Sequence, residues 1–421
     1  MQQFEREDSV KFQMKSESLD DVIKVMEICE NFVDDESGFP LFPVYNWQLI
    51  KSTFSEEAIR DGIAKYLVEN EIHFPLKKFT LSNLKKLFVE LKNRSVNDYK
   101  ISHKTETRYQ YRSIDKVGWT ISDKLNKYDM LSNCIQEKNR MITNTKGNSY
   151  FYEWERGRVR SLSSGLFYKE PKAITYGRYR YNIGKKCGAS QFRVAYAKYI
   201  IEKFNAYKVL DPCGGWGDRL MGALIANGVV NYTVIDPNKD VIDGYYKEIE
   251  MYSDLIEPEK KINIINDCAE KVDFDTKVGK DFDLVLTSPP YHTAELYQND
   301  KNDNQSHIMY PELIDFKTKF LFPMLEKCFN SLRRGGTMLI NISDYIDRDS
   351  KQRVEICDDM VDFLKSIGLK FNGTIGYPLN FNSANYESSP DSFPNIDSEC
   401  AEELKTRKRI FVEPVWHFSK T

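Results

Sequence analysis

Four consecutive residues after an apolar run could bind and orient an amino group. Ser288, Pro289, Pro290 and Tyr291 directly follow Leu-Val-Leu, a run typical of a buried strand. Proline has no N–H, so carbonyls at this strand end are left free to face a ligand. The Ser288 hydroxyl and the Pro289 carbonyl could accept the N–H bonds of an amine and aim its lone pair at an electrophile. The alternative is a strand stopped by Pro-Pro and covered by a tyrosine.

A second candidate site is a glycine-rich turn. The segment Asp211-Pro212-Cys213-Gly214-Gly215-Trp216-Gly217 follows an apolar strand and opens a helix. At such a turn only glycine lets the backbone approach a bound ligand closely. A tight turn packed under the helix without any ligand remains the alternative.

Two later strands each end in an acidic residue, Asp236 and Asp267. In an open parallel sheet, ligands bind at the carboxyl ends of the strands, so both carboxylates should lie at the edge that holds the glycine turn. Asp236 could accept hydrogen bonds from ribose hydroxyls and Asp267 from an adenine amino group. Asp236 followed by proline is also a good helix start, with the aspartate as N-cap.

From about residue 185 to 421, these motifs resemble the amino-directed DNA methyltransferases of the Ser-Pro-Pro-Tyr type, which modify cytosine N4 or adenine N6. The resemblance implies a Rossmann-like domain that binds S-adenosylmethionine. It implies cofactor contacts from the glycine turn, from both acidic strand ends and from a preceding segment: Asp211, Pro212, Gly215, Gly217, Asp236, Asp267, Ser190 and Phe192. It implies catalysis by Ser288, Pro289, Pro290 and Tyr291. A flipped base would stack on the Tyr291 ring. Trp216 and Arg219 depart from the family pattern.

The function implied by this resemblance is methyl transfer to an exocyclic amino group in DNA, without a metal or a covalent intermediate. A serine at position 288 resembles the cytosine N4 branch more than the adenine N6 branch. Two alternatives stay open: an RNA base amino-methyltransferase, and a nucleic-acid-binding protein that keeps the fold but has lost catalysis. A restriction–modification role would need a separate nuclease, because the sequence shows no nuclease constellation.

Recognition of nucleic acid must come from outside the short stretch between the two motifs. Residues 92–186 contain 21 Lys and Arg against 9 Asp and Glu, a net charge of +12 in a chain whose total is −3. Arginine contacts phosphates and guanine, and interleaved tyrosines can stack on bases. We therefore expect nucleic-acid contacts from five arginines: Arg156, Arg158, Arg160, Arg178 and Arg180. A solvated basic surface with tyrosines in a small β core is the alternative.

The order of elements that would position these residues predicts an α/β fold. Alternating strands and helices from residue 190 onward indicate a doubly wound sheet, closed by strands at 370–379 and 409–418. Helical spacing is evident before residue 93, with Ser18 and Ser55 as N-caps. We expect strands and loops at 94–184 and a surface loop at 380–407. The predicted organisation is a helical region at 1–93, a basic recognition region at 94–184 and a catalytic domain at 185–421.

Composition is consistent with a globular protein. Of 421 residues, 41% are hydrophobic and 29% are charged, which is enough to build sizeable cores. The chain shows no membrane-length apolar stretch and no signal-like leader, so a cytoplasmic location is expected. Its eight cysteines form no CxxC pair and its five histidines do not cluster with them. Reduced thiols and no metal site are therefore expected.

Overall fold

The computed structural model describes residues 15–142, 154, 172–179, 191–297, 304–347 and 349–421. The chain forms two compact units. The helical unit contains Met1–Lys78, Arg140–Ala189 and Tyr297–Asn299. The sheet unit contains Phe79–Asn139, Ser190–Leu296 and Asp300–Thr421.

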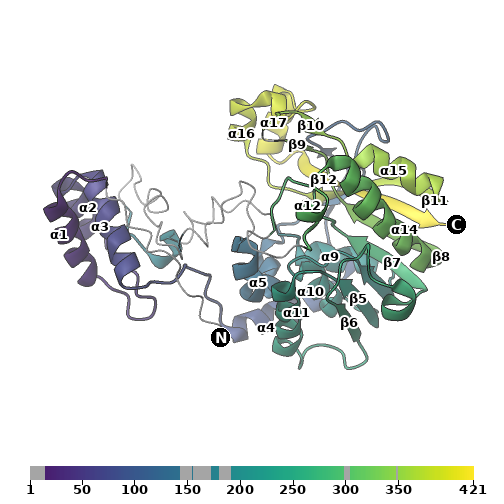
Figure 1. The fold of residues 1–421 in the computed structure, drawn as a ribbon, viewed down its shortest axis with the longest axis horizontal. Helices are drawn as coiled ribbons and strands as arrows, with labels where there is room; N and C mark the ends of the chain where they lie inside the picture. Colours follow the sequence, from purple (N-terminus) through teal and green to yellow (C-terminus); the bar gives the residue numbers. More distant parts are fainter. Residues whose placement is uncertain (1–14, 143–153, 155–171, 180–190, 298–303, 348) are drawn as a thin grey trace. The chain divides into compact units, whose positions relative to one another are not determined.

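A mostly parallel sheet forms the centre of the sheet unit (Figure 1). Across it the strands lie in the order β11 (Leu369–Pro378), β12 (Ile410–Lys420), β8 (Leu332–Asn341), β7 (Phe282–Thr287), β4 (Lys208–Asp211), β5 (Asn231–Ile235) and β6 (Lys261–Ile265). Strand β12 runs antiparallel to β11 and β8, and the pairs from β8 to β6 are parallel. The predicted doubly wound, Rossmann-like fold is confirmed by this order.

Helices cover both faces of the sheet. Successive strand residues point to opposite faces, and since both sets are apolar here, each face must be buried against helices. Val209 and Leu284 face the cluster built with α4 (Leu81–Lys92), α9 (Val194–Lys203), α10 (Asp218–Ile225) and α11 (Lys239–Met251). Leu210 and Val285 face the cluster built with η5 (Phe316–Leu321), α14 (Phe322–Ser331) and α15 (Cys357–Ser366). The near-continuous apolar strands are therefore explained by burial on both faces.

Connections at the sheet edges are short elements. They are η4 (Phe274–Val278), α12 (Ser306–Met309), α13 (Leu313–Asp315) and the hairpin of β9 (Tyr345–Ile346) with β10 (Arg353–Val354). The segment Arg334-Gly335-Gly336 lies inside β8, where Gly335 has φ +76° and the register against β7 shifts. It is a bulge in the strand.

Residues 94–142 differ from the strands and loops expected there. The segment contains η1 (Val96–Asp98), β1 (Ile101–Ser102), β2 (Thr105–Glu106), β3 (Thr120–Ile121), η2 (Asn126–Asp129) and the helix α5 (Met130–Ile142). The expectation of strands and loops alone was wrong. The face that α5 buries includes the polar residues Ser132 and Gln136, four positions apart, so an apolar helical pattern is weak there.

Residues 79–139 pack onto the sheet, so the compact units do not follow the three ranges drawn from composition. Strand β2 adds to the sheet beside β12. The Thr120 hydroxyl donates a buried hydrogen bond of 2.6 Å to the Gly376 carbonyl of β11. Phe88 of α4 stacks on Tyr252, with ring centroids 5.1 Å apart.

The insertion at 380–407 is also more ordered than the expected surface loop. It folds into α16 (Ser383–Ser388), η6 (Pro390–Ser392) and α17 (Ser398–Lys405). A small apolar cluster that includes Phe393, Cys400 and Leu404 packs against Phe411 of β12. The spacing of Cys400 and Leu404 buries one face of α17, and the insertion therefore forms a structured cap on this strand.

The helical unit contains α1 (Leu19–Glu30), α2 (Val44–Thr53) and α3 (Glu56–Glu69). Ser18 and Ser55 cap α1 and α3 as predicted, accepting hydrogen bonds from the backbone N–H groups of Asp21 and Ala58. Aromatic residues from distant segments fill its core, with Phe39 against Trp154, Tyr176 and Tyr179.

In the part of the chain that the structure describes, no helix combines the length and apolarity needed to cross a bilayer. The seven cysteines in that part are free thiols: Cys29, Cys134, Cys213, Cys268, Cys328, Cys357 and Cys400.

Candidate functional site at the carboxyl edge of the sheet

Four predicted motifs follow neighbouring parallel strands. The glycine turn follows β4, and the Ser-Pro-Pro-Tyr segment follows the adjacent β7. Asp236 follows β5, on the other side of β4, and Asp267 comes two residues after β6. Chain connections diverge on either side of β4, which makes its carboxyl end the topological switch point where ligands of doubly wound folds bind.

Two glycines of the turn are closely packed against neighbouring side chains, whereas the third has open space beside it. Gly217 is the N-cap of α10 with φ +75°, and a Cβ there would lie 2.3 Å from Oε1 of the buried Glu248. A Cβ on Gly214 would lie 2.3 Å from Val234. A Cβ on Gly215 would meet only the end of the Arg219 side chain, at 3.8 Å. Gly214 and Gly217 are therefore needed for packing, whereas Gly215 leaves its backbone approachable.

Asp211 lies at the end of β4, with no exposed surface. Its Oδ2 accepts hydrogen bonds from Arg219 Nε at 2.8 Å and from the Tyr232 hydroxyl at 2.9 Å. Arg219 also donates to the Cys213 carbonyl inside the turn. Arg219 thus clamps the turn to the strand, and Pro212 in the turn is buried.

Asp236 connects β5 to the glycine turn. Its Oδ2 accepts a hydrogen bond from Gly215 N at 2.9 Å, and its Oδ1 accepts one from Asn238 N at 2.9 Å. Burial raises the pKa of Asp236 to about 6, against the lowering effect of these two bonds. The N-cap of α11 is Asn238, not Asp236, so the helix-start alternative does not hold.

Asp267 is half-buried, like Asp236. Its Oδ1 accepts a hydrogen bond from Cys268 N at 2.8 Å, and Lys277 Nζ lies 3.3 Å from Oδ2. An ionised carboxylate has about four acceptor positions, so Asp236 and Asp267 both keep capacity for hydroxyl or amino donors. Both acceptors follow strands on the same side of β4, with Asp236 directly beside the glycine turn.

At the Ser-Pro-Pro-Tyr segment, Pro289 is buried, and Ser288, Pro290 and Tyr291 are partly exposed. The Tyr291 hydroxyl donates to Oε2 of Glu413 on β12 at 3.0 Å and contacts the Asn341 carbonyl of β8 at 3.4 Å. Burial, and then the charge and hydrogen bond of Glu413, raise the pKa of Tyr291 well above its usual value. The ring is therefore held by two strands beyond β7.

His292 is buried and has φ +52°, an uncommon backbone conformation for a residue with a side chain. Its Nδ1 is 2.9 Å from the Tyr345 hydroxyl and its Nε2 is 2.7 Å from the Pro311 carbonyl. These contacts fasten the chain directly after Tyr291, so His292 is not an exposed loop residue.

The remaining predicted site residues lie either away from the ends of these strands or outside the described part of the chain. Phe192 is buried and stacks on Tyr377, with centroids 4.8 Å apart, and the Arg219 guanidinium lies 5.1 Å from its ring. Arg178 belongs to the helical unit and donates to the Ala173 carbonyl at 2.9 Å. Tyr179, next to Arg178, is buried in that unit's core. Ser190, Arg156, Arg158, Arg160 and Arg180 lie outside the described residues.

Two carboxylates at this edge escaped sequence reasoning. Glu413 lies within the apolar run of the closing strand. A charged residue inside such a run was the signal that could have marked it as a site residue. Glu248 lies within α11 and carries no such signal, because one acid on an amphipathic helix is usually solvated. Only packing places it under Gly217.

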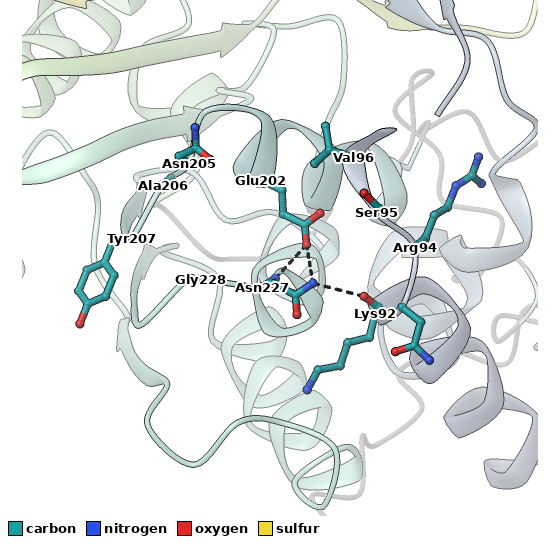
Figure 2. A pocket seen from close by; sticks show the side chains of 11 residues that line it. Lys92, Arg94, Ser95, Val96, Glu202, Asn205, Ala206, Tyr207, Asn227 and Gly228 are labelled. Carbon is teal, nitrogen blue, oxygen red and sulfur yellow. Dashed lines mark hydrogen bonds between the residues drawn. The ribbon is translucent and has the colours of Figure 1, made fainter. Parts of the chain in front are cut away.

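A separate groove of about 610 Å³ is lined by Lys92, Arg94, Glu202, Tyr207, Asn227 and neighbouring residues (Figure 2). Glu202 Oε1 accepts hydrogen bonds from the Asn227 backbone and side chain at 2.9 and 3.2 Å. Tyr207 and Gly228 precede β4 and β5, which puts the groove at the amino edge of the sheet. It is therefore distinct from the candidate site.

Comparisons with models of protein families and with curated protein sequences find no match. Solved structures similar to this chain include a protein described as an S-adenosylmethionine-dependent methyltransferase from Listeria monocytogenes, with 10% identity, 54% of this chain and 99% of that chain covered, and a TM-score of 0.30. A TehB-like methyltransferase from Corynebacterium glutamicum has 14% identity, coverage of 58% and 96%, and a score of 0.30. An O-methyltransferase of Brevibacillus brevis in complex with S-adenosyl-L-homocysteine has 13% identity, coverage of 58% and 76%, and a score of 0.33.

Proposed function

We propose that the protein is an S-adenosylmethionine-dependent methyltransferase acting on an exocyclic amino group of a nucleic-acid base, with cytosine N4 in DNA favoured over adenine N6. One observation carries the proposal: the Ser-Pro-Pro-Tyr segment and the glycine turn follow adjacent parallel strands, β7 and β4, at the topological switch point. A base held at the first lies beside a cofactor held at the second.

The chain's own residues supply the cofactor contacts. The approachable backbone at Gly215 would hold the methionine part, Asp236 the ribose hydroxyls and Asp267 the adenine amino group. Asp211 acts indirectly, because its carboxylate is occupied by Arg219 and Tyr232 while it positions the turn. When bound, S-adenosylmethionine supplies an electrophilic methyl group.

Catalysis would rest on orientation of the amine. Ser288 and the Pro289 carbonyl would accept the two N–H bonds of the amine, and the ring of Tyr291 would stack on the base. Such an exocyclic nitrogen is a poor nucleophile because its lone pair is delocalised into the ring. The protein would therefore accelerate the reaction mainly by fixing the geometry of this amino group. In a duplex, the base would have to flip out of the stack, at a cost of a few kcal/mol.

Recognition of the substrate is proposed for the basic arginines, of which only Arg178 lies among the described residues. DNA is the favoured polyanion because of the resemblance in residues 185–421, and RNA is the alternative. Arginines at these positions would contribute a salt-dependent affinity for phosphates.

The test uses the purified full chain with labelled S-adenosylmethionine and, separately, duplex DNA and RNA, followed by nucleoside mass spectrometry. Methylated cytosine or adenine in DNA, lost in Ser288→Ala but kept in Ser366→Ala on the exposed end of α15, is the expected result. Label in RNA alone would select the RNA enzyme. Nucleic-acid binding without transfer would indicate a fold that has lost catalysis.

A further inference from the structure

A chain of polar groups leads away from the proposed amine site across the sheet. Its first member is the Ser288 side chain, which is close enough to Tyr291 to lower the pKa of that phenol. Its second is the Tyr291 hydroxyl, which donates to Glu413 Oε2 at 3.0 Å. Asn341 Nδ2 lies 3.4 Å from the same carboxylate oxygen. Three elements that follow or form neighbouring strands thus meet at one carboxylate.

One hydrogen bond in this chain has a direction that supports proton transfer. The Tyr291 hydroxyl donates to Glu413 Oε2. That bond raises the pKa of Tyr291, as expected when a phenol donates to a carboxylate. The phenol proton therefore already points at Glu413, the orientation that its transfer to the carboxylate requires.

Glu413 is suited to accept a proton. Burial raises the pKa of its carboxyl group, and hydrogen bonds from Tyr291 and Asn341 act in the opposite direction. Glu413 as a residue is partly exposed. Methylation of an amine creates a need for such a group, because the product nitrogen carries one proton too many.

We propose that Ser288, Tyr291 and Glu413 form a proton relay that deprotonates the amine during methyl transfer, an inference that rests on the proposed function. As the nitrogen lone pair bonds to the methyl carbon, the carbon–sulfur bond breaks and sulfur keeps that electron pair. The nitrogen then gives one proton to Ser288 Oγ, whose own hydroxyl proton passes to Tyr291. The Tyr291 hydroxyl proton passes in the same step to Glu413, which ends as a neutral carboxylic acid.

A concerted transfer is required because the pKa of Tyr291 is raised well above its usual value, so a free tyrosinate would be unfavourable. The ionisation of Glu413 and Tyr291 also depends on charged and titratable groups facing them from the neighbouring elements: Arg108, Tyr111, Glu295, Cys357 and Tyr377. Of these, the Arg108 charge lowers the pKa of Glu413 and would help expel the proton afterwards.

The test compares Glu413→Gln, Tyr291→Phe and the control Glu326→Gln, an exposed glutamate of α14, in the full chain. Glutamine still accepts a hydrogen bond from Tyr291 but cannot take a proton, so it separates relay from mere positioning. Single-turnover rates are measured across pH with the nucleic acid that the wild type methylates. Calorimetry with S-adenosylmethionine and thermal unfolding check cofactor binding and folding.

The expected result is a loss of about 10²-fold or more in rate for Glu413→Gln and for Tyr291→Phe, with cofactor affinity and folding unchanged. The wild-type rate should rise with pH as Glu413 ionises, and this rise should be absent in Glu413→Gln. Normal turnover by either variant would overturn the relay and leave the methyltransferase proposal standing. A slow Glu413→Gln variant that keeps the wild-type pH profile would also overturn it. If the wild type transfers no methyl group to any nucleic acid, the proposed function fails and the relay fails with it.

Discussion

Arg219 and Asp211 form a buried ion pair, with Nε 2.8 Å from Oδ2, that ties the first turn of α10 to the end of β4. Both side chains are at most 5% exposed. Neither charge can be solvated if the other is removed. The glycine turn lies between them along the chain, so its shape depends on this pair.

Replacing one member of the pair should therefore destabilise the protein strongly. Arg219→Met leaves a buried carboxylate without its cation, and we expect a loss of about 3–5 kcal/mol in the free energy of unfolding. Urea unfolding of Arg219→Met, Asp211→Asn and the double variant measures the coupling. The double variant should lose less than the sum of the two singles, and simple additivity would contradict the pairing.

Gly217→Ala should damage the turn far more than Gly228→Ala. Both glycines have positive φ, +75° and +83°. Backbone strain in each alanine variant should therefore lower the free energy of unfolding by a similar amount, about 1–2 kcal/mol. Only at Gly217 would the new methyl group overlap Glu248, whereas nothing lies within 4 Å at Gly228. Urea unfolding and calorimetry should show weakened cofactor binding for Gly217→Ala alone. Equal effects of the two changes would mean that the Glu248 contact is unimportant.

Binding of S-adenosylmethionine should weaken below about pH 6. The pKa of Asp236 is raised to about 6 from 3.8, and ribose hydroxyls donate to its ionised form. The dissociation constant should be flat above that pH and rise by about tenfold per pH unit below it. In the ligand-free protein, the raised pKa means that Asp236 contributes stability at low pH, which is lost as the pH rises through about 6.

Calorimetry from pH 4.5 to 8 with wild type and Asp236→Asn checks this dependence. The asparagine variant should bind more weakly and without that pH dependence. A wild-type profile that matches the variant would assign the titration to another group.

Phe88→Ala should destabilise the sheet unit although its helix precedes the region that resembles a methyltransferase. Phe88 is fully buried and stacks on Tyr252, so its truncation should cost about 3–5 kcal/mol. Val89 is its neighbour on α4 and is 42% exposed, so Val89→Ala should cost about 0.5 kcal/mol or less. Thermal and urea unfolding of the two variants measure this difference. Similar stabilities would mean that α4 is not part of the core.

Strand and helix order after residue 190 was predictable because parallel strands buried on both faces read as apolar runs. Val209-Leu210 and Leu284-Val285-Leu286 are examples, and both are central strands. Special residues at strand ends marked the site: glycines at positive φ, and acids or prolines that interrupt an apolar pattern. The secondary structure of residues 94–142 and 380–407 was harder to predict, because their short elements gain stability mainly from packing against the sheet.

The sequence by itself determined the doubly wound order and the motifs that follow β4, β5, β6 and β7, since local spacing and residue chemistry carry that information. Only the tertiary structure decided which groups meet. Asp211 is separated by eight residues from Arg219 and by 21 from Tyr232, and Tyr291 by 122 from Glu413. Such contacts depend on strand order and register, which bring distant residues to one edge of the sheet and leave no periodic signal along the chain.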